Sequence, residues 1–260
     1  MAKIGIIGGS GLYDSGLLED SKQIKVNTPF GRTSDLVTVG KFKGVDLVFI
    51  PRHGKGHSLN PTEVPYRANV WAMKELKVTH ILAPSAVGSL KEEYRPGDLA
   101  FTDQFIDRTT KREQSFYGGN QVCHISIAEP GCKYLRNMLT MEARRLNLSH
   151  KERGTCVVIE GPRFSTKAES NLYRQWNADI IGMTMVPEVV LAREAQICYQ
   201  TIAMVTDYDV WKTDHTVTLD EVIKVMNENV AKARQLLSEV IPKIADNDCS
   251  CKHALDTALI

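Results

Sequence analysis

Short hydrophobic runs recur along the chain and predict buried β-strands. They lie at residues 3–7, 36–39, 45–50, 79–83, 99–102, 156–159 and 199–205. Apolar runs of this length, bounded by glycine, proline or polar residues, are typical of strands inside a sheet. Because the first strands follow one another before residue 51, we expect part of the sheet to be antiparallel.

Longer segments between the later runs show helical periodicity. Residues 65–76 and 187–197 each begin with a proline, which favours the first turn of a helix. Residues 132–146 carry apolar side chains at helical spacing. Thr166 and Thr218 each stand three residues before a glutamate, a pattern that predicts a capped helix start. Strands that alternate with helices predict an α/β fold with a mixed central β-sheet flanked by helices.

The chain shows no repeat, low-complexity segment or Pro/Ser-rich linker, so we predict one domain over residues 1–245. Residues 246–260 look like a separate C-terminal tail that contains Cys249-Ser250-Cys251. With 43% hydrophobic residues, the chain can bury one substantial core. The net charge of +1 favours neither nucleic acid nor a membrane surface as a partner.

The N-terminus reads as the first strand of a cytoplasmic protein, because its apolar run is short and leads straight into glycines. No apolar run reaches the roughly 18 residues that a membrane-spanning helix needs. Six cysteines are unusual for the cytoplasm, where disulfides are rare except in hyperthermophiles.

The most distinctive polar stretch is Thr206-Asp207-Tyr208-Asp209, which directly follows the apolar run 202–205. Side chains alternate in direction along a strand, so Asp207 and Asp209 should point to the same side. Aspartates favour turns and helix caps, and one interpretation is a solvated loop. The other is an acid site at the mouth of an α/β sheet, where open sheets bind ligands.

Other predicted strand ends carry groups suited to anions. Gly8-Gly9-Ser10-Gly11 could cradle a phosphate or form a simple tight turn, and Asp14 breaks a dinucleotide-binding pattern. Arg52 offers a planar fork of donors suited to phosphate. His53 and His57 lie four residues apart, but no further ligand completes a metal set nearby, so we expect no metal.

Three more stretches follow predicted strands. They are Ser85-Ala86-Val87-Gly88-Ser89, Glu160-Gly161-Pro162-Arg163-Phe164-Ser165 and Gly182-Met183-Thr184-Met185-Val186-Pro187-Glu188. Phe164 could be a core aromatic or a stacking face for a flat ring. The helix after Thr184 would favour an anion near its N-terminus. Together these strand ends predict a site for a phosphate, a sugar and a polar ring.

The same motifs, in this order and joined by Arg95-Pro96-Gly97-Asp98 and Asp103-Gln104-Phe105-Ile106-Asp107-Arg108-Thr109, resemble the trimeric purine nucleoside phosphorylases from about Lys3 to Ile244. Within that family the chain is similar to members that act on 5′-methylthioadenosine. The resemblance implies phosphorolysis to adenine and 5-methylthio-α-D-ribose 1-phosphate, with inorganic phosphate as co-substrate and no metal or organic cofactor. It also implies a mixed sheet and a homotrimer, or a hexamer made of two trimers.

The resemblance also assigns roles to single residues. Phosphate would be held by Ser10, Arg52, His53, Ser85, Ala86 and Thr184, with the Ala86 backbone near the sugar. Met183 would lie against the ribose, and Phe164 and Ser165 would line the base pocket. Asp207 would donate a proton to N7, and Asp209 would accept from the 6-amino group. Val217, Leu219 and Val222 would wall the methylthio pocket, with His124 entering from a neighbouring subunit.

One departure is Gly182, where animal members of the family carry Asn. The Cys-Ser-Cys tail is similar to that of archaeal thermophile members, which implies a Cys132–Cys198 disulfide. Cys249 and Cys251 are close enough in sequence to pair with each other. Two other functions stay open. A phosphorylase for 6-oxopurines would favour Asn at position 207, and a non-catalytic nucleotide-binding module would not need both an anion site and an acid.

Overall fold

A mixed β-sheet runs through the molecule in the computed structural model, which describes residues 2–9, 18–212 and 219–260, without the side chains of residues 219–222. Eleven strands of the described residues form this sheet, and β3 and β4 form a separate pair. The strands are β1 (Ile4–Gly8), β2 (Glu19–Ile24), β3 (Asn27–Thr28), β4 (Gly31–Arg32), β5 (Val37–Phe42), β6 (Val45–Pro51), β7 (His80–Ser89), β8 (Leu99–Phe101), β9 (Gln104–Arg108), β10 (His150–Lys151), β11 (Thr155–Ile159), β12 (Ile180–Gly182) and β13 (Cys198–Asp207). The predicted fold class, a mixed sheet flanked by helices, is confirmed.

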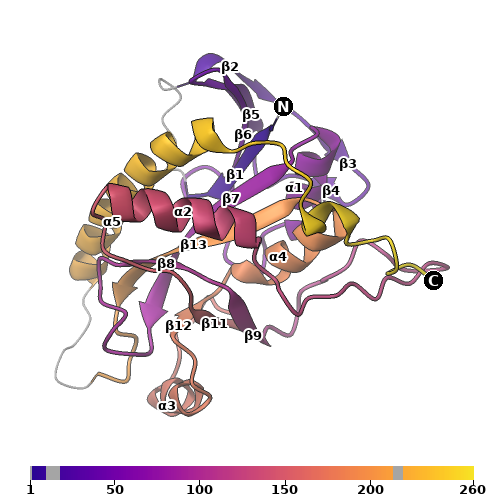
Figure 1. The fold of residues 1–260 in the computed structure, drawn as a ribbon. Helices are drawn as coiled ribbons and strands as arrows, with labels where there is room; N and C mark the ends of the chain where they lie inside the picture. Colours follow the sequence, from indigo (N-terminus) through magenta and orange to yellow (C-terminus); the bar gives the residue numbers. More distant parts are fainter. Residues whose placement is uncertain (1, 10–17, 213–218) are drawn as a thin grey trace.

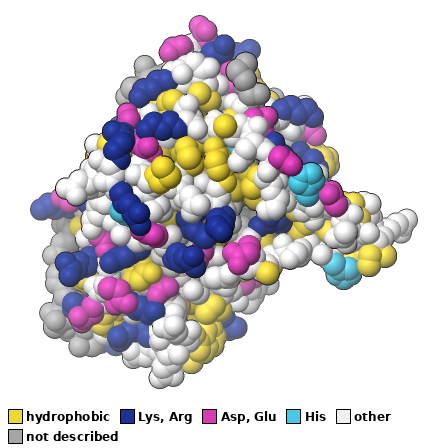
Figure 2. Space-filling model, viewed as in Figure 1, with side chains coloured by type: hydrophobic (Ala, Val, Ile, Leu, Met, Phe, Trp, Pro, Cys, Tyr) yellow, Lys and Arg dark blue, Asp and Glu magenta, His cyan; other side chains and the backbone are white. Residues whose placement is uncertain are grey.

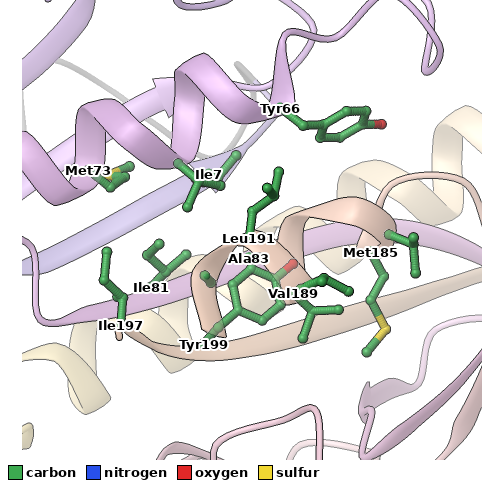
Figure 3. Close-up of a cluster of buried hydrophobic side chains, with 14 of the residues drawn as sticks. Ile7, Tyr66, Met73, Ile81, Ala83, Met185, Val189, Leu191, Ile197 and Tyr199 are labelled. Atoms are coloured by element: carbon green, nitrogen blue, oxygen red, sulfur yellow. The ribbon is translucent and has the colours of Figure 1, made fainter. Parts of the chain in front are cut away.

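The helices cover both faces of the sheet (Figure 1). They are α1 (Tyr66–Glu75), α2 (Lys133–Arg145), α3 (Lys167–Gln175), α4 (Met185–Glu194) and α5 (Leu219–Val240), followed by the short 3₁₀ helices η3 (Ile241–Lys243) and η4 (Ser250–His253). Residues of α1 and α4 share one hydrophobic core, part of which is drawn in Figure 3. Residues of α2 and α5 share the other core. Side chains along β1 alternate between the two cores: Ile7 packs in the first, and Ile4 and Ile6 pack in the second.

The sheet divides at β7. The main strand order is β10-β8-β13-β7-β1-β6-β5-β2, with β1 parallel to both β6 and β7, and β7 parallel to β13. Strands β2, β5 and β6 pair antiparallel, as we expected for the segment before residue 51. The far end of β7 also pairs antiparallel with β12, which leads through β11 to β9. The branch gives the molecule a second group of strands beside the main sheet.

Strand β7 is longer than the hydrophobic pattern predicted. It continues to Ser89 because β13 pairs with it from His80 to Gly88 and β12 pairs with its last residues. Residues 85–89 therefore lie inside a strand rather than after its end. Pairing on both sides supplies the backbone hydrogen bonds that allow small and polar residues to continue a strand.

Two of the predicted helix starts can be compared with the structure. Thr166 forms the predicted capping box, since its hydroxyl accepts from Glu169 N at 3.1 Å and the Glu169 carboxylate accepts from Thr166 N at 2.7 Å. The α4 range starts at Met185, but Val186 has non-helical angles (φ −101°, ψ 130°), so the regular helix begins at Pro187, as predicted. The predicted cap at Thr218 lies outside the described residues.

The C-terminal residues 246–260 pack onto the rest of the protein. Cys251 is buried in the core shared by α2 and α5. Val122 and Ile260 exchange backbone hydrogen bonds of 3.0 and 3.3 Å, and His124 N donates to Ala258 O at 2.8 Å. In Figure 1 this segment runs beside the loop that precedes α2. The predicted tail is thus attached along much of its length.

The described helices include none that is long and apolar enough to cross a membrane. On the face drawn in Figure 2, basic and acidic side chains are interspersed over the surface. This distribution agrees with the near-zero net charge of the sequence.

Four cysteines gather where the C-terminal segment packs on the rest of the protein. The sulfur atoms of Cys132, Cys198, Cys249 and Cys251 lie within 4.8 Å of one another, and Cys132 Sγ is 3.7 Å from Cys249 Sγ. All six cysteines are free thiols in the structure, so neither predicted pair is bonded here. Hydrogen bonds from the thiols of Cys198 and Cys251 lower the pKa of Cys132. A thiolate among three thiols is suited to disulfide formation and to metal binding.

We expect this cluster to form disulfides under oxidising conditions and to stabilise the fold. A bridge between Cys132 and Cys198 would contribute about 4 kcal/mol by chain entropy, so reductant should lower the thermal midpoint by about 10 °C. Cys132→Ser should remove this sensitivity, and Cys156→Ser, a buried cysteine outside the cluster, should retain it. Six titratable thiols in the unfolded protein, with an unchanged midpoint and no bound metal, would contradict the prediction.

Candidate functional site

A cavity of about 620 Å³ opens where β1, β6 and β13 end, along the second half of β7, which lies between β1 and β13 in the sheet. Ten of the predicted site residues line it: Arg52, His53, Ser85, Ala86, Phe164, Ser165, Met183, Thr184, Asp207 and Asp209. Ser10 and Val217 lie outside the described residues, as do the side chains of Leu219 and Val222. His124 is exposed and does not line this cavity. Residues from five separate motifs thus meet in one place.

One end of the cavity is rich in hydrogen-bonding groups. The hydroxyls of Ser85 and Thr184 lie 2.9 Å apart, which joins β7 to the start of α4. Thr184 stands at the N-cap position of α4, yet its side chain does not cap the helix. The dipole of α4, whose regular part begins at Pro187, would favour an anion near these hydroxyls.

Arg52 lies at the same end, and its side chain is almost fully buried. Its Nε and Nη2 donate to the two carboxylate oxygens of Glu188 at 2.6 and 3.0 Å. Its Nη1 donates to Pro84 O at 3.0 Å, and Nη2 also donates to Ile7 O at 2.8 Å. The sequence predicted that this donor fork would serve phosphate, but Glu188 occupies it. The guanidinium has five N–H groups, so these bonds leave one for a ligand.

His53 is neutral at physiological pH. Burial lowers its pKa to about 4, and the charge of Arg52 acts in the same direction. Its Nδ1 lies 2.9 Å from the carbonyl oxygen of Leu59, so Nδ1 carries the proton and Nε2 is left as an acceptor. The His53 ring stacks on His57 with 4.2 Å between centroids.

The two aspartates meet at the end of β13, although strand alternation is not what brings them together. The strand ends at Asp207, and Asp209 takes a left-handed conformation with φ of 51°. Asp207 Oδ1 accepts from Asp209 N, and Oδ2 accepts from Thr206 Oγ1, both at 2.7 Å. Burial raises the pKa of Asp209, although the hydroxyl of Ser170 acts in the opposite direction. The family resemblance implies that Asp207 donates the proton, whereas Asp209 is the carboxyl whose pKa burial raises.

The remaining walls come from the β11–α3 connection and the strand that precedes α4. Phe164 is 75% exposed and stands at the rim, while Ser165 is buried. The carbonyl of Met183 accepts a hydrogen bond from Arg112, which also donates to Val186 O at 2.6 Å and to Glu160 O at 2.7 Å. Arg112 therefore fixes the backbone on which Met183 and Thr184 stand.

Sequence reasoning missed several groups that line the cavity. Asn60 and Glu63 reach it from the loop after β6, where backbone N–H groups donate to each other's side chains. Met226 lines it from α5. Met226 lies on the apolar face of that helix, as a core residue would. No local sequence signal distinguishes a methionine that lines a cavity from one in the core.

Among the described residues, the four cysteines form the group of three or more His, Cys, Asp or Glu side chains that lie close enough together to bind a metal ion. None of these cysteines lines the cavity. The cavity itself offers His53, His57 and Glu63 among its lining residues, and these do not form such a group.

Comparison with known proteins gives a consistent result. A family model described as the phosphorylase superfamily matches residues 3–242. The S-methyl-5′-thioadenosine phosphorylase of Pyrococcus furiosus is 54% identical over 261 residues, which span 100% of both chains. A methylthioadenosine phosphorylase structure from an antarctic soil metagenomic library matches with a TM-score of 0.95 and 43% identity, over 100% of this chain and 92% of that one. The Schistosoma mansoni methylthioadenosine phosphorylase, in complex with adenine, matches with a TM-score of 0.93 and 40% identity over 99% of both chains. The predicted family resemblance is confirmed.

His53 should make stability depend on pH. Its pKa is 6.5 in an unfolded chain and about 4 in the fold, so between these values the unfolded state binds more protons. Stability from neutral His53 is full above pH 6.5 and is lost as pH falls through about 4, with a size on the order of 2 kcal/mol. Unfolding free energies from pH 8 to 4 should fall less in His53→Asn, which keeps a donor toward Leu59. Parallel curves for the two proteins would refute this assignment.

Proposed function

This chain belongs to the phosphorylase superfamily, and from that premise we propose that it catalyses the phosphorolysis of 5′-methylthioadenosine. The products are adenine and 5-methylthio-α-D-ribose 1-phosphate, which makes the enzyme a pentosyltransferase. The observation that carries the proposal is one cavity lined at one end by Arg52, Ser85 and Thr184 and at another by two aspartates. Relatives named for this activity, alike over the full length, support it.

The reaction breaks the bond between the sugar C1′ and N9 of adenine, and a bond between C1′ and a phosphate oxygen replaces it. The electron pair of the broken bond leaves with the base, so adenine needs a proton at N7. A positioned acid supplies such a proton with a typical gain of 10²–10⁴ in rate. The pair Asp207/Asp209 is suited to this task, because Asp209 is buried beside Asp207 and burial raises the pKa of its carboxyl.

Positive charge develops on the sugar as the bond breaks. Phosphate on the opposite face stabilises that charge and then attacks, which gives the α-anomer. Ser85, Thr184, Arg52 and the N-terminus of α4 hold the phosphate in position, and placing both reactants in line is itself a large part of catalysis. The Met183 backbone, supported by Arg112, lies against the ribose. Phe164 and Ser165 border the base. The proposed chemistry uses inorganic phosphate and no metal or organic cofactor.

The proposal includes a homotrimer or a hexamer made of two trimers. His124 lies on the loop that pairs with the C-terminal residues, and its exposed side chain is outside its own cavity. That position supports a role in the cavity of a neighbouring subunit. The methylthio pocket assigned by the family resemblance to Val217, Leu219 and Val222 is part of the proposal, and Met226 of α5 lines the described cavity. A cytoplasmic location is part of the same proposal.

The first test is release of free adenine from 5′-methylthioadenosine with and without inorganic phosphate. We expect adenine only when phosphate is present, in equal amount to the sugar phosphate. Methylthioinosine serves as the matched 6-oxo substrate and should react more slowly. Release without phosphate would indicate a hydrolase. No release would favour a nucleotide-binding module, and faster reaction of the inosine would favour a 6-oxopurine phosphorylase.

The second test separates the aspartates. Asp207→Asn keeps a donor toward N7 but cannot deliver a proton, so kcat should fall by about 10²–10⁴ while substrate binding survives. Asp209→Asn can present either its oxygen or its amide, so it should reject a 6-oxo base less sharply, by about 1–3 kcal/mol. The measurement is kcat/KM for both nucleosides in both variants. The reverse pattern would give the proton to Asp209, the carboxyl whose pKa is raised.

A further inference from the structure

A second buried charge stands behind the phosphate end of the cavity. Glu188, in the first turn of α4, has no exposed surface and contacts the Arg52 guanidinium through both carboxylate oxygens. Tyr199 on β13 donates its hydroxyl hydrogen to Glu188 Oε2 at 2.9 Å, and Thr201 donates to the Tyr199 oxygen at 3.4 Å. Glu188 does not line the cavity, so any effect on a ligand must pass through Arg52.

This carboxylate is tightly enclosed. Burial by itself would lower the pKa of Arg52, but the charge and hydrogen bonds of Glu188 more than offset that and leave it above its usual value. Burial, together with the charge of Glu188, raises the pKa of Tyr199, which keeps the phenol protonated as a donor. Tyr199 packs in the hydrophobic cluster with Val189 and Leu191 (Figure 3). Little water reaches the pair, and the geometry cannot relax easily.

The arrangement determines what Arg52 can offer a ligand. Two of its N–H groups are directed at Glu188, and two more are held by the carbonyls of Ile7 and Pro84. Its positive charge is balanced by the carboxylate. One N–H of Nη1 has no hydrogen bond to a described residue, and it lies beside the strand that carries Ser85. Arg52 therefore resembles a fixed single donor more than a free cation.

We propose that Glu188, held in place by Tyr199, is a positioning residue for the phosphate subsite: it orients Arg52 and neutralises it, so that phosphate is recognised by directed hydrogen bonds. This inference rests on the proposed function, since it names how the same site holds its inorganic substrate. It also explains a fully buried ion pair, which by itself is weak support for a fold. The residue that touches phosphate remains Arg52.

The test compares two variants on one helix. Glu188→Gln presents an amide NH₂ to one of the Arg52 N–H groups, so the guanidinium must turn. Loss of one directed hydrogen bond to a charged ligand is expected to raise KM for phosphate about tenfold, with KM for methylthioadenosine within about twofold of wild type. Glu194→Gln is the control, because Glu194 is equally buried on α4 but accepts from Ser115 and Phe116 N, away from the cavity. It should leave both KM values unchanged.

Tyr199→Phe removes only the hydroxyl that holds Glu188 and should raise KM for phosphate in the same selective way, by about threefold. A second readout, the rise of the thermal midpoint on addition of inorganic phosphate, needs no turnover. It should be smaller in Glu188→Gln and Tyr199→Phe than in wild type and Glu194→Gln. Because this rise reports phosphate binding alone, it tests the inference even if the wild-type protein releases no adenine and the proposed function fails.

Selective weakening of phosphate in both variants supports the inference. It would be overturned by an unchanged KM for phosphate with an unchanged phosphate-induced rise of the thermal midpoint, by equal effects on the KM of both substrates, or by the same effect in Glu194→Gln. If Glu188→Gln does not fold, Tyr199→Phe decides by the same criteria. Failure of both to fold would make the network purely structural and would also overturn it.

Discussion

The ion pair between Arg52 and Glu188 connects four elements at the point where the cavity forms. Arg52 follows β6, Glu188 stands on α4, and the two carbonyls that accept from Arg52 belong to β1 and β7. Removing one partner of such a buried pair typically costs about 3–5 kcal/mol, because the other charge is left uncompensated. The ends of β1 and β6, the middle of β7 and the start of one helix are thus held at fixed distances, which makes the phosphate end of the cavity rigid.

The pairing of β7 with β13 positions the groups at the base end of the cavity. The two strands run parallel from His80 and Cys198 to Gly88 and Asp207, with a shift of register between Val205 and Asp207. Side by side they place Ser85 and Asp207 in one cavity. Gly88 leaves room for Asp207 there, since a Cβ at this position would lie 3.0 Å from Asp207 Oδ1. The distance between the phosphate-binding side chains and the acidic pair is therefore set by the sheet and not by a loop.

The two ends of the cavity differ in their electrostatics. At the phosphate end, Arg52 is compensated by Glu188 and His53 is neutral, so an anion meets directed donors and little net charge. At the base end, burial raises the pKa of Asp209 and so favours its protonated form. A reaction that needs an acid at one end and an anion at the other benefits from this separation, because a strong positive charge near the aspartates would lower their pKa.

The sequence by itself determined the class of fold, most strands and helices, and ten of the residues that line the cavity. Short apolar runs, proline and capping-box helix starts and ordered motifs are local signals, and they need only neighbouring residues to act. Tertiary structure alone decided the rest. Strand β2, made of exposed polar residues, exists because β5 offers an edge for it, and β7 reaches Ser89 because β13 and β12 pair with it. The partner of Arg52 is 136 residues away, and no local pattern distinguishes Glu188 from an ordinary acidic residue in a first helical turn. Hydrogen bonding and burial between distant segments set the charge, direction and pKa of the cavity's groups, and these properties arise only when the chain has folded.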